Sequence, residues 1–395
     1  MHSRQVLASL CGSLMAAMSL FGCAGSATSP ADIHTACEIC ASGQGASAVT
    51  GDMQQHADTA CEAAAIPGEQ ALSLWTADAA AKKELIAYID AITAPGADHI
   101  PPQDRIAVFD LDGTLICETD PDYLDYSIFV YRVLEDPDYR SKATPAQIEV
   151  AQSILEVYKT GVFHDWIDAA HQKAYYEVFA GMTIDEFSRY VEAFLEQPAP
   201  GYEGMKRGEA FYKPMLEVIE YLKSHQFTVY IVSGTDRLQV RAMIAHHIDI
   251  PENQVIGSDG TIVARGQEMT QDQSAANLQY VYKPEDELVR GDRLIVKNLK
   301  MNKVAVIAQE IGKQPVLSFG NSSGDASMAQ YVITHNRYKS KAFMLLADDL
   351  VRENGNIKAA DSMSASCKAN GWIPISMKND WTTIYGDGVT RKISE

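Results

Sequence analysis

The stretch "RIAVFDLDGTLICETD", residues 105–120, decides the fold, because it ends an apolar run with two carboxylates. The run ends at Asp110 and reads as a short buried strand. Asp112 lies two residues further on, and Gly113 and Thr114 then form a tight turn whose N–H groups suit an anion. Two carboxylates this close repel each other unless a cation or a shared proton offsets the repulsion. The stretch therefore predicts a strand whose carboxyl end carries chemistry.

Strand and helix patterns alternate on both sides of a helical block. Alternation of this kind predicts an α/β fold with a doubly wound parallel sheet. Residues 123–196 repeat apolar side chains at helical spacing, with no strand signal, and the Pro/Gly-rich "QPAPGYEG" closes them. The block is therefore expected to be an all-helical lobe inserted into the sheet domain. The expected strands are residues 106–110, 228–232, 315–319 and 342–346, the expected helices are residues 73–92, 216–223, 238–247 and 303–311, and residues 255–264 are expected to form a hairpin turning at Asp259 and Gly260.

The composition is that of a globular protein with an acidic surface. The chain has 395 residues, 46% of them hydrophobic, which is enough for one large domain or two smaller ones. Its formal net charge is 33 − 52 = −19. This excess of negative charge disfavours nucleic acid as a partner, because nucleic acids are polyanions.

The N-terminal segment has the features of an export signal. Arg4 lies in a short polar start, and the following apolar run is too short for a comfortable membrane span. The run ends in "LFGC", which resembles the lipobox of bacterial lipoproteins and implies lipidation of Cys23. A plain secretory signal cleaved nearby is the alternative. The Ala/Ser/Gly/Thr-rich residues 24–68 read as a flexible tether, so the chain is expected in the cell envelope, periplasmic or surface-exposed, anchored to a membrane.

Three of the expected strands end in polar turns that contain glycine. Ligands of open α/β sheets bind beyond the carboxyl ends of the strands. In "SGTD", Ser233 and Gly234 precede a helix and offer a hydroxyl and N–H groups to an anion. In "GNSSGD", Asn321 and Asp325 offer oxygen atoms to a metal, and Lys303 opens an expected helix as a positive point charge.

These groups together suit attack on phosphorus. A hard divalent cation such as Mg²⁺ takes oxygen ligands and leaves room for a phosphate oxygen. The metal and the lysine would neutralise a phosphate so that the carboxylate of Asp110 can approach it and form an aspartyl-phosphate. Asp112 would first protonate the leaving alkoxide and then activate a water molecule.

"DLDGT", "VSGT", a lysine that opens a helix and "GNSSGD", in this order, resemble the four motifs of the haloacid dehalogenase-like superfamily. The resemblance covers residues 105–346 and implies a Rossmann-like core with Mg²⁺-dependent phosphatase chemistry. It implies Asp110 as nucleophile and Asp112 as acid/base, with the Asp110 carboxylate and the Asp112 backbone carbonyl on the metal. It also implies that Ser233 and Lys303 hold the phosphoryl group. The helical insert matches the family's C1 cap position, which is most similar to phosphoserine and phosphorylcholine phosphatases.

The fourth motif departs from the family pattern. The first acid of the family's Gly-Asp-x-x-x-Asp is replaced by Asn321, whose amide oxygen ligates more weakly, so Asp325 is expected to be the main carboxylate of this loop. Lys300 lies close to Lys303 and is the alternative phosphate lysine.

Substrate contacts are harder to predict. Glu118, followed by Asp120 and Asp122, lies where the cap begins, and a carboxylate there is expected either to pair with a substrate amine or to be a solvated acidic turn. Aromatic residues of the block are expected to be cap core rather than a cage for a quaternary ammonium, and Arg237 either reaches substrate or pairs with Asp236 or solvent. These aromatic residues are Tyr123, Tyr126, Trp166, Tyr175 and Tyr176.

The sequence therefore predicts a secreted, lipid-anchored, Mg²⁺-dependent phosphomonoesterase for a small phosphorylated metabolite. Two alternatives remain open: a phosphotransferase with the same intermediate, and a non-catalytic envelope lipoprotein that binds a phosphorylated ligand. The expected domains are a signal peptide (1–23), the tether (24–68), a core (69–118 and 205–395) and a helical cap (119–204).

Overall fold

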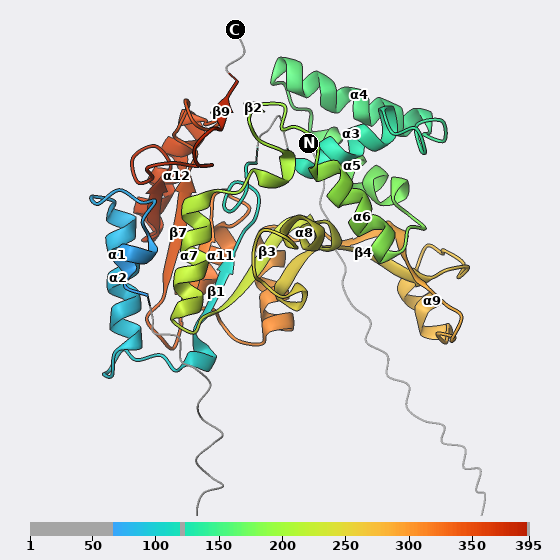
Figure 1. Cartoon of the computed structure of the whole chain (residues 1–395). Coiled ribbons are helices and arrows are strands. Elements are labelled where there is room, and N and C mark those ends of the chain that lie inside the picture. The colour runs from blue at the N-terminus through green and yellow to red at the C-terminus, as the bar shows by residue number, and fades with distance from the viewer. Residues whose placement is uncertain (1–65, 119–122, 393–395) are drawn as a thin grey trace, which may run out of the picture. The chain divides into compact units, whose positions relative to one another are not determined.

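The computed structural model describes residues 66–118 and 123–392 (Figure 1). They belong to one compact unit, Ala63–Glu395, which contains both the helical block and the sheet. The predicted domain boundaries therefore stay predictions. Cys23, the signal, residues 24–65 of the tether, Asp120 and Asp122 lie outside the described residues.

A mostly parallel seven-stranded sheet forms the centre of this unit and confirms the predicted α/β class. The strand order is β5-β4-β3-β1-β6-β7-β8, and only β5 runs antiparallel to its neighbour. A separate antiparallel pair joins β2 (Tyr202–Glu203) and β9 (Thr390–Arg391). The sheet strands are β1 (Ile106–Phe109), β3 (Thr228–Asp236), β4 (Val255–Ala264), β5 (Leu288–Val296), β6 (Leu317–Gly320), β7 (Lys341–Leu346) and β8 (Ile373–Ser376).

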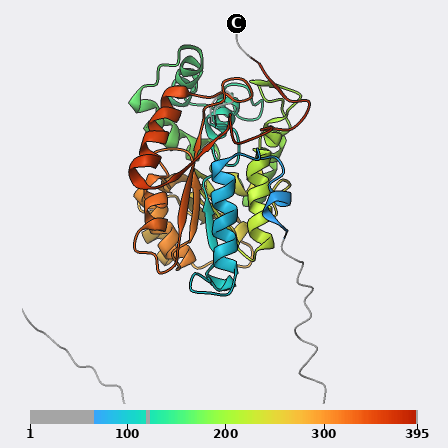
Figure 2. The same ribbon diagram turned by 90° about the vertical axis from the view of Figure 1, so that its left-hand side faces the viewer.

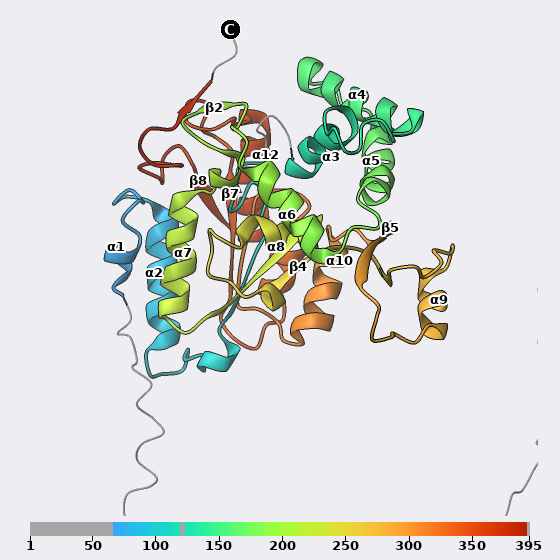
Figure 3. The ribbon, with the colours of Figure 1, turned by 45° about the vertical axis from the view of Figure 1, so that its right-hand side comes forward.

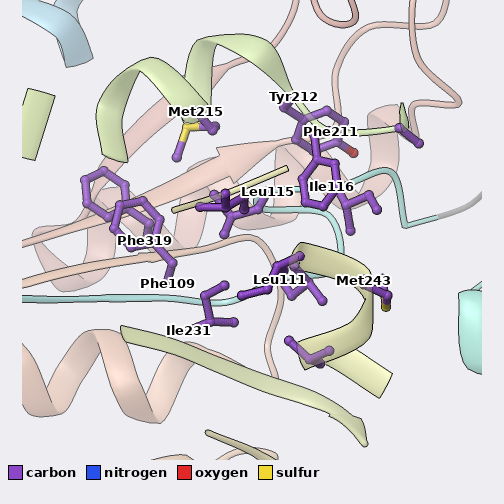
Figure 4. Packing of buried hydrophobic residues seen from close by; sticks show 14 of the residues in the cluster. Phe109, Leu111, Leu115, Ile116, Phe211, Tyr212, Met215, Ile231, Met243 and Phe319 are labelled. Carbon is purple, nitrogen blue, oxygen red and sulfur yellow. The ribbon is translucent and has the colours of Figure 1, made fainter. Parts of the chain in front are cut away.

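Helices cover both faces of the sheet. Successive strand residues point to opposite faces, and all four apolar residues of β1 are buried, so both faces have to be covered. Phe109 packs with the helices of one face, whereas its neighbour Val108 packs with those of the other. Phe109 stacks on Phe319 of β6 with ring centroids 4.3 Å apart, which ties the two central strands together (Figure 4). Figure 2 shows the strands between the two helical layers. The first face carries α1 (Gly68–Ala71), α2 (Ala80–Thr93), α7 (Lys213–Ser224) and α8 (Arg237–Ile244); the second carries α10 (Met301–Val306), a π-helical turn (Ile307–Ile311), α11 (Ala326–Ile333) and α12 (Ile357–Asn370).

The predicted helical block is present between β1 and β2 (Figure 3). Two of its helices begin with capping boxes, in which Thr144 and Thr183 accept from the backbone N–H three residues on. Helix α5 packs along β5, and α6 packs on α8, so the block rests on the sheet domain. The block contains α3 (Leu124–Leu134), α4 (Pro145–Thr160), α5 (Asp165–Val178) and α6 (Ile184–Leu195), and α9 (Gln273–Gln279) lies between β4 and β5.

The predicted hairpin over residues 255–264 is wrong. These residues form the single strand β4, which pairs along its second half with β5, a strand that the sequence did not indicate. Gly260, read as a turn residue, instead permits close packing: a Cβ there would lie 2.4 Å from Cε1 of Tyr176 in α5. The glycine therefore serves the approach of the helical block and not a reversal of the chain.

The predicted helix over residues 73–92 is also wrong in its first part. Helix α2 begins at Ala80, and Trp75 pairs instead with Trp381 in an antiparallel bridge. The C-terminal segment contributes β8 to the sheet edge, where it pairs with β7. Among the helices of the described residues, none is long and apolar enough to span a membrane.

Candidate active site

The two aspartates of the first motif face the same side because Leu111 between them points into the core. Leu111 has no exposed surface and lies close to Ile231 and Met243 (Figure 4). Asp110 and Asp112 are 6% and 8% exposed and line a cavity at the carboxyl end of the sheet. The structure thus brings the predicted pair to one place.

A buried lysine joins the first motif to the fourth. Lys303 Nζ donates to Asp110 Oδ1 at 2.5 Å, to Asp325 Oδ1 at 2.7 Å and to the carbonyl of Val232 at 2.6 Å. All three of its hydrogens are directed at these acceptors, and the side chain has no exposed surface. In this arrangement the positive charge of Lys303 offsets the negative charges of Asp110 and Asp325. Direct contact of Lys303 with a phosphoryl group stays a prediction. Neither Lys303 nor the alternative, Lys300, lines the cavity, but Lys300 is exposed, whereas Lys303 bonds to Asp110 and Asp325.

The carboxylates of the site are held in a low-dielectric environment. Burial raises the pKa of Asp110 well above its ordinary value, the charge of Asp325 raises it further, and Lys303 opposes both effects. Burial also raises the pKa of Asp112 to about 6, while the hydrogen bond from Thr235 lowers it. A carboxyl with such a pKa is able to carry a proton near neutral pH, as the first step of the predicted chemistry requires.

The second motif lies beside Asp112. The hydroxyl of Thr235 donates to Asp112 Oδ2 at 2.7 Å, and the backbone N–H of Thr235 donates to Ser233 Oγ at 3.0 Å. Gly234 and Thr235 line the cavity, whereas Ser233 is fully buried behind them. Thr114 is also fully buried, and its hydroxyl lies 3.4 Å from Asp110 Oδ2.

The departure at Asn321 has a local explanation. Its amide Nδ2 donates to Glu118 Oε2 at 3.0 Å, and Tyr123 donates to the other oxygen, Oε1, at 2.6 Å. An aspartate at 321 would place a second carboxylate against Glu118. Burial already raises the pKa of Glu118 to about 7. Gly113 is packed against the same pair, since a Cβ there would lie 1.9 Å from Asn321 Nδ2.

The cavity has a volume of about 160 Å³ and lies between the sheet domain and the helical block. The block contributes Tyr123, Asp125, Tyr126 and Asp168 to its lining. Tyr126, Tyr175 and Tyr176 are buried, as expected for cap core, but Tyr123 and Trp166 are exposed and that expectation is wrong for them. The core side contributes Asp110, Asp112, Glu118, Gly234, Thr235, Lys297, Leu299, Asn321, Ser322 and Asp325.

Arg237 does not enter the cavity. Its guanidinium pairs with Asp259 at 2.8 Å and with Glu310 at 2.6 Å. Asp236, one of the alternatives considered for Arg237, pairs instead with Arg290.

The donor atoms of the site fit a hard divalent cation. Asp110, Asp325 and Asn321 offer carboxylate and amide oxygens, the ligand type that Mg²⁺ prefers. The repulsion that raises the pKa of Asp110 is what a cation would relieve. Within the described residues, no group of three or more His, Cys, Asp or Glu side chains is placed to hold a metal ion, so a neutral oxygen, such as the backbone carbonyl of Asp112, has to complete any such site.

Several residues of the site were missed by sequence reasoning. Thr235 was part of a quoted motif but received no role. Asn298 is fully buried, and its Nδ2 donates to the carbonyl of Ser233 at 3.0 Å. Lys297 beside it lines the cavity, with Nζ 4.0 Å from Asp125 Oδ2. Both follow β5, so recognition of that strand was the signal needed to place them.

The chain belongs to the haloacid dehalogenase-like hydrolase family, whose model matches residues 107–330. This match includes all four motifs and confirms the predicted resemblance. Among curated proteins, none matches the chain.

Solved structures resemble the chain at low identity. A conserved protein of unknown function from Anaerococcus prevotii is 12% identical over 77% of this chain and 94% of its own, with a TM-score of 0.46. Cytosolic 5'-nucleotidase IIIB bound to cytidine is 12% identical over 76% and 88%, with a TM-score of 0.44. A phosphoserine phosphohydrolase-like protein from Francisella tularensis is 14% identical over 62% and 88%, with a TM-score of 0.33. Similarity at this level identifies no function for the chain.

Proposed function

We propose that the chain is a Mg²⁺-dependent phosphomonoesterase that acts through an aspartyl-phosphate on Asp110. The observation that carries the proposal is the convergence of Asp110, Asp112 and Asp325 at one cavity of a haloacid dehalogenase-like hydrolase. The buried Lys303 donates hydrogen bonds to Asp110 and Asp325. Asp110, Asp325 and the backbone carbonyl of Asp112 would hold Mg²⁺. When bound, the ion would supply positive charge to the phosphoryl oxygens.

The residues divide the reaction into two balanced steps. A carboxylate oxygen of Asp110 attacks phosphorus, the bond from phosphorus to the leaving oxygen breaks, and Asp112 gives its proton to that oxygen. A water molecule then attacks phosphorus while Asp112 takes its proton, the aspartyl–phosphorus bond breaks, and inorganic phosphate leaves with Asp110 restored. Lys303 holds the Asp110 carboxylate in place throughout through its hydrogen bond to Oδ1.

The lining of the cavity supports a small substrate that carries an amine. The helical block covers the site, and its Asp125 and Asp168 join Glu118 as carboxylates outside the four motifs. Lys297 is the positively charged side chain among the residues that line the cavity, so these three carboxylates outnumber it. A phosphoester that carries a positive charge at its other end is therefore favoured. Phosphoserine and phosphorylcholine should therefore be turned over faster than sugar phosphates, and a phosphoprotein much more slowly than any of these.

The direct test is hydrolysis of p-nitrophenyl phosphate with Mg²⁺, then with a chelator. Activity should be lost with the chelator and fall by about a thousandfold or more in Asp110→Asn. Asp361→Asn, an exposed aspartate of α12, is the matched control and should keep full activity. Activity that survives in Asp110→Asn would exclude an aspartyl-phosphate at this position.

Product analysis distinguishes hydrolysis from transfer. With glycerol added, a phosphatase releases inorganic phosphate in step with the alcohol. A phosphotransferase would instead release less phosphate than alcohol and form glycerol phosphate. Ligand binding without turnover of any ester would favour the non-catalytic alternative.

The location of the chain is proposed from the sequence of residues 1–23 alone. We propose that Cys23 is lipidated and anchors the chain to a membrane of the cell envelope. Labelling of the wild type with radioactive palmitate, and its loss together with membrane association in Cys23→Ser, would support this. Release of the unlabelled wild type as a soluble secreted protein would contradict it.

A further inference from the structure

Thr235 forms hydrogen bonds with both Asp112 and Ser233 of the candidate site. Its hydroxyl donates to Asp112 Oδ2 at 2.7 Å across 123 residues of chain, and its backbone N–H donates to Ser233 Oγ at 3.0 Å. Thr235 is 4% exposed, so water does not compete strongly for these bonds. Because Ser233 Oγ accepts a bond there, its own hydrogen stays available for another acceptor.

The hydrogen bond also distinguishes the two oxygens of Asp112. While the hydroxyl donates to Oδ2, that oxygen is an acceptor, and the proton that Asp112 transfers is carried on Oδ1. A carboxyl without this contact can rotate and expose either oxygen, and proton transfer depends on geometry before anything else. The contact therefore selects which oxygen works.

The surrounding structure holds Thr235 in place. The register of β3 shifts between Val232 and Asp236, and this irregularity in the strand contains Thr235. Asp236 accepts from Arg290 at 3.0 and 3.2 Å and caps α8 through the N–H groups of Leu238 and Gln239 at 3.1 Å.

The same support reaches the helical block. Arg290 is 2% exposed, and its guanidinium lies 3.8 Å from the ring centroid of Phe187 in α6. On the other side, Gly257 passes so close that a Cβ would lie 2.7 Å from the Thr235 carbonyl oxygen. Thr235 is thus fixed by β4, β5 and the helical block together.

We infer that Thr235 is a positioning residue that orients Asp112 so that Oδ1 delivers the proton to the leaving oxygen. The inference rests on the proposed function, because it needs a leaving oxygen to protonate. Loss of the contact should therefore lower kcat/KM most for esters whose leaving group is a weak acid, because such a group has to be protonated as it departs.

The test compares two esters of similar size with Thr235→Val, which keeps the branched shape and removes the hydroxyl. Phenyl phosphate leaves as a weakly acidic phenol, whereas p-nitrophenol is a far better leaving group. In Thr235→Val, kcat/KM for phenyl phosphate should fall by about tenfold or more, whereas kcat/KM for p-nitrophenyl phosphate should fall by less than about threefold. Because kcat/KM reports the formation of the aspartyl-phosphate, a slow second step does not mask the difference.

Two further variants guard against a structural effect. Thr235→Ser restores a hydroxyl and should recover the wild-type ratio between the two esters. Thr228→Val, at the opposite end of β3, is the matched control and should leave both esters unchanged. Should Thr235→Val fail to fold, Thr235→Ala replaces it in the same comparison, with melting temperatures measured for each variant.

The outcomes separate this inference from the proposed function. An equal loss for both esters in Thr235→Val, or no loss for either, would overturn the positioning role alone. A wild type that cleaves only the p-nitrophenyl ester has no leaving-group protonation to lose and also overturns it. A wild type that cleaves neither ester with Mg²⁺ refutes the phosphatase proposal, and the role of Thr235 falls with it.

Discussion

Gly113 lies at the tightest point of the candidate site. Its φ of +73° belongs to the left-handed region, and a Cβ would lie 1.9 Å from Asn321 Nδ2 and 2.8 Å from Glu118 Oε2. Gly113→Ala should therefore lower the free energy of unfolding by about 1 kcal/mol for the backbone and by a further 1–3 kcal/mol, roughly, for the contacts. Urea unfolding at pH 7 measures the sum.

Gly161 provides the matched control for this change. It has a similar φ of +67° at the end of α4, and a Cβ there would meet nothing within 4 Å. Gly161→Ala should show the backbone cost only and leave activity unchanged. Equal losses of stability at the two positions would mean that the loop around Gly113 yields without cost.

His171 makes the stability of the protein depend on pH. It is 2% exposed, and its Nε2–H donates to the carbonyl of Asp125 at 3.3 Å. Burial lowers its pKa to about 4; the charge of Lys297 also lowers it, and those of Asp125 and Asp168 oppose. The unfolded chain takes up the proton near pH 6.5, so stability from this group is present above pH 6.5 and is lost as pH falls towards 4.

The size of this effect follows from the shift in pKa. Between pH 7 and pH 4, the wild type should lose about 3 kcal/mol more unfolding free energy than His171→Gln, whose amide can donate to the same carbonyl. Denaturant titrations at several pH values measure how the unfolding free energy of each protein changes with pH. The difference between the two proteins removes the contributions of all other titrating groups. Parallel slopes would show that His171 takes up a proton in the folded state without penalty.

The motifs predicted the carboxylates of the site but not the residues that form hydrogen bonds to the motif residues. Asp110 and Asp112 could be placed from sequence because a strand followed by a turn fixes their positions locally. Thr235 and Asn298 could not, because their partners lie 123 and 65 residues away and depend on the path of β3 and β5. Sequence patterns encode local geometry, whereas such contacts depend on packing between elements.

The ion pair between Asp236 and Arg290 joins β3, β5, α8 and the helical block. Both side chains are less than 5% exposed, and the charge of Asp236 raises the pKa of Arg290 against the effect of burial. Arg290→Met would leave a buried carboxylate without its partner and should lower the unfolding free energy by about 3–5 kcal/mol. The double variant Asp236→Asn/Arg290→Met should recover part of this loss.

An exposed pair provides the comparison. Lys206 and Glu196 lie 2.7 Å apart with side chains 50% and 71% exposed. Lys206→Met should change stability by less than about 1 kcal/mol. If Arg290→Met costs no more than Lys206→Met, the buried pair does not hold these elements together.

The prediction of elements succeeded where each pattern was local. The central strands and the helical block were found because their apolar spacing is strong within the element. The hairpin over residues 255–264 was wrong because Gly260 resembles a turn residue, although its role is to admit Tyr176 of α5. A sequence alone does not show which of these two uses of glycine applies.

At the scale of the whole molecule, the two ends of the described chain close the sheet domain together. Trp75 Nε1 donates to the carbonyl of Pro214 at 3.1 Å, and its ring meets that of Trp381 edge-on with centroids 5.9 Å apart. The backbone N–H of Thr76 donates to Asp380, and that of Thr382 donates to Leu74. These contacts explain why residues 73–79 leave the predicted helix: they pair with a partner about 300 residues away.

Trp75 should consequently contribute to global stability although it does not line the cavity of the candidate site. Trp75→Ala should lower the free energy of unfolding by about 3–5 kcal/mol, because it opens a cavity beside Trp381 and frees a buried carbonyl. Trp166→Ala removes a tryptophan that is 47% exposed and should cost less than about 1 kcal/mol. In a double-mutant cycle, Trp75→Ala and Trp381→Ala should show a coupling of about 0.5–1.5 kcal/mol from their edge-on contact. Additive losses would mean that the two ends of the chain stabilise the sheet domain independently, and not through each other.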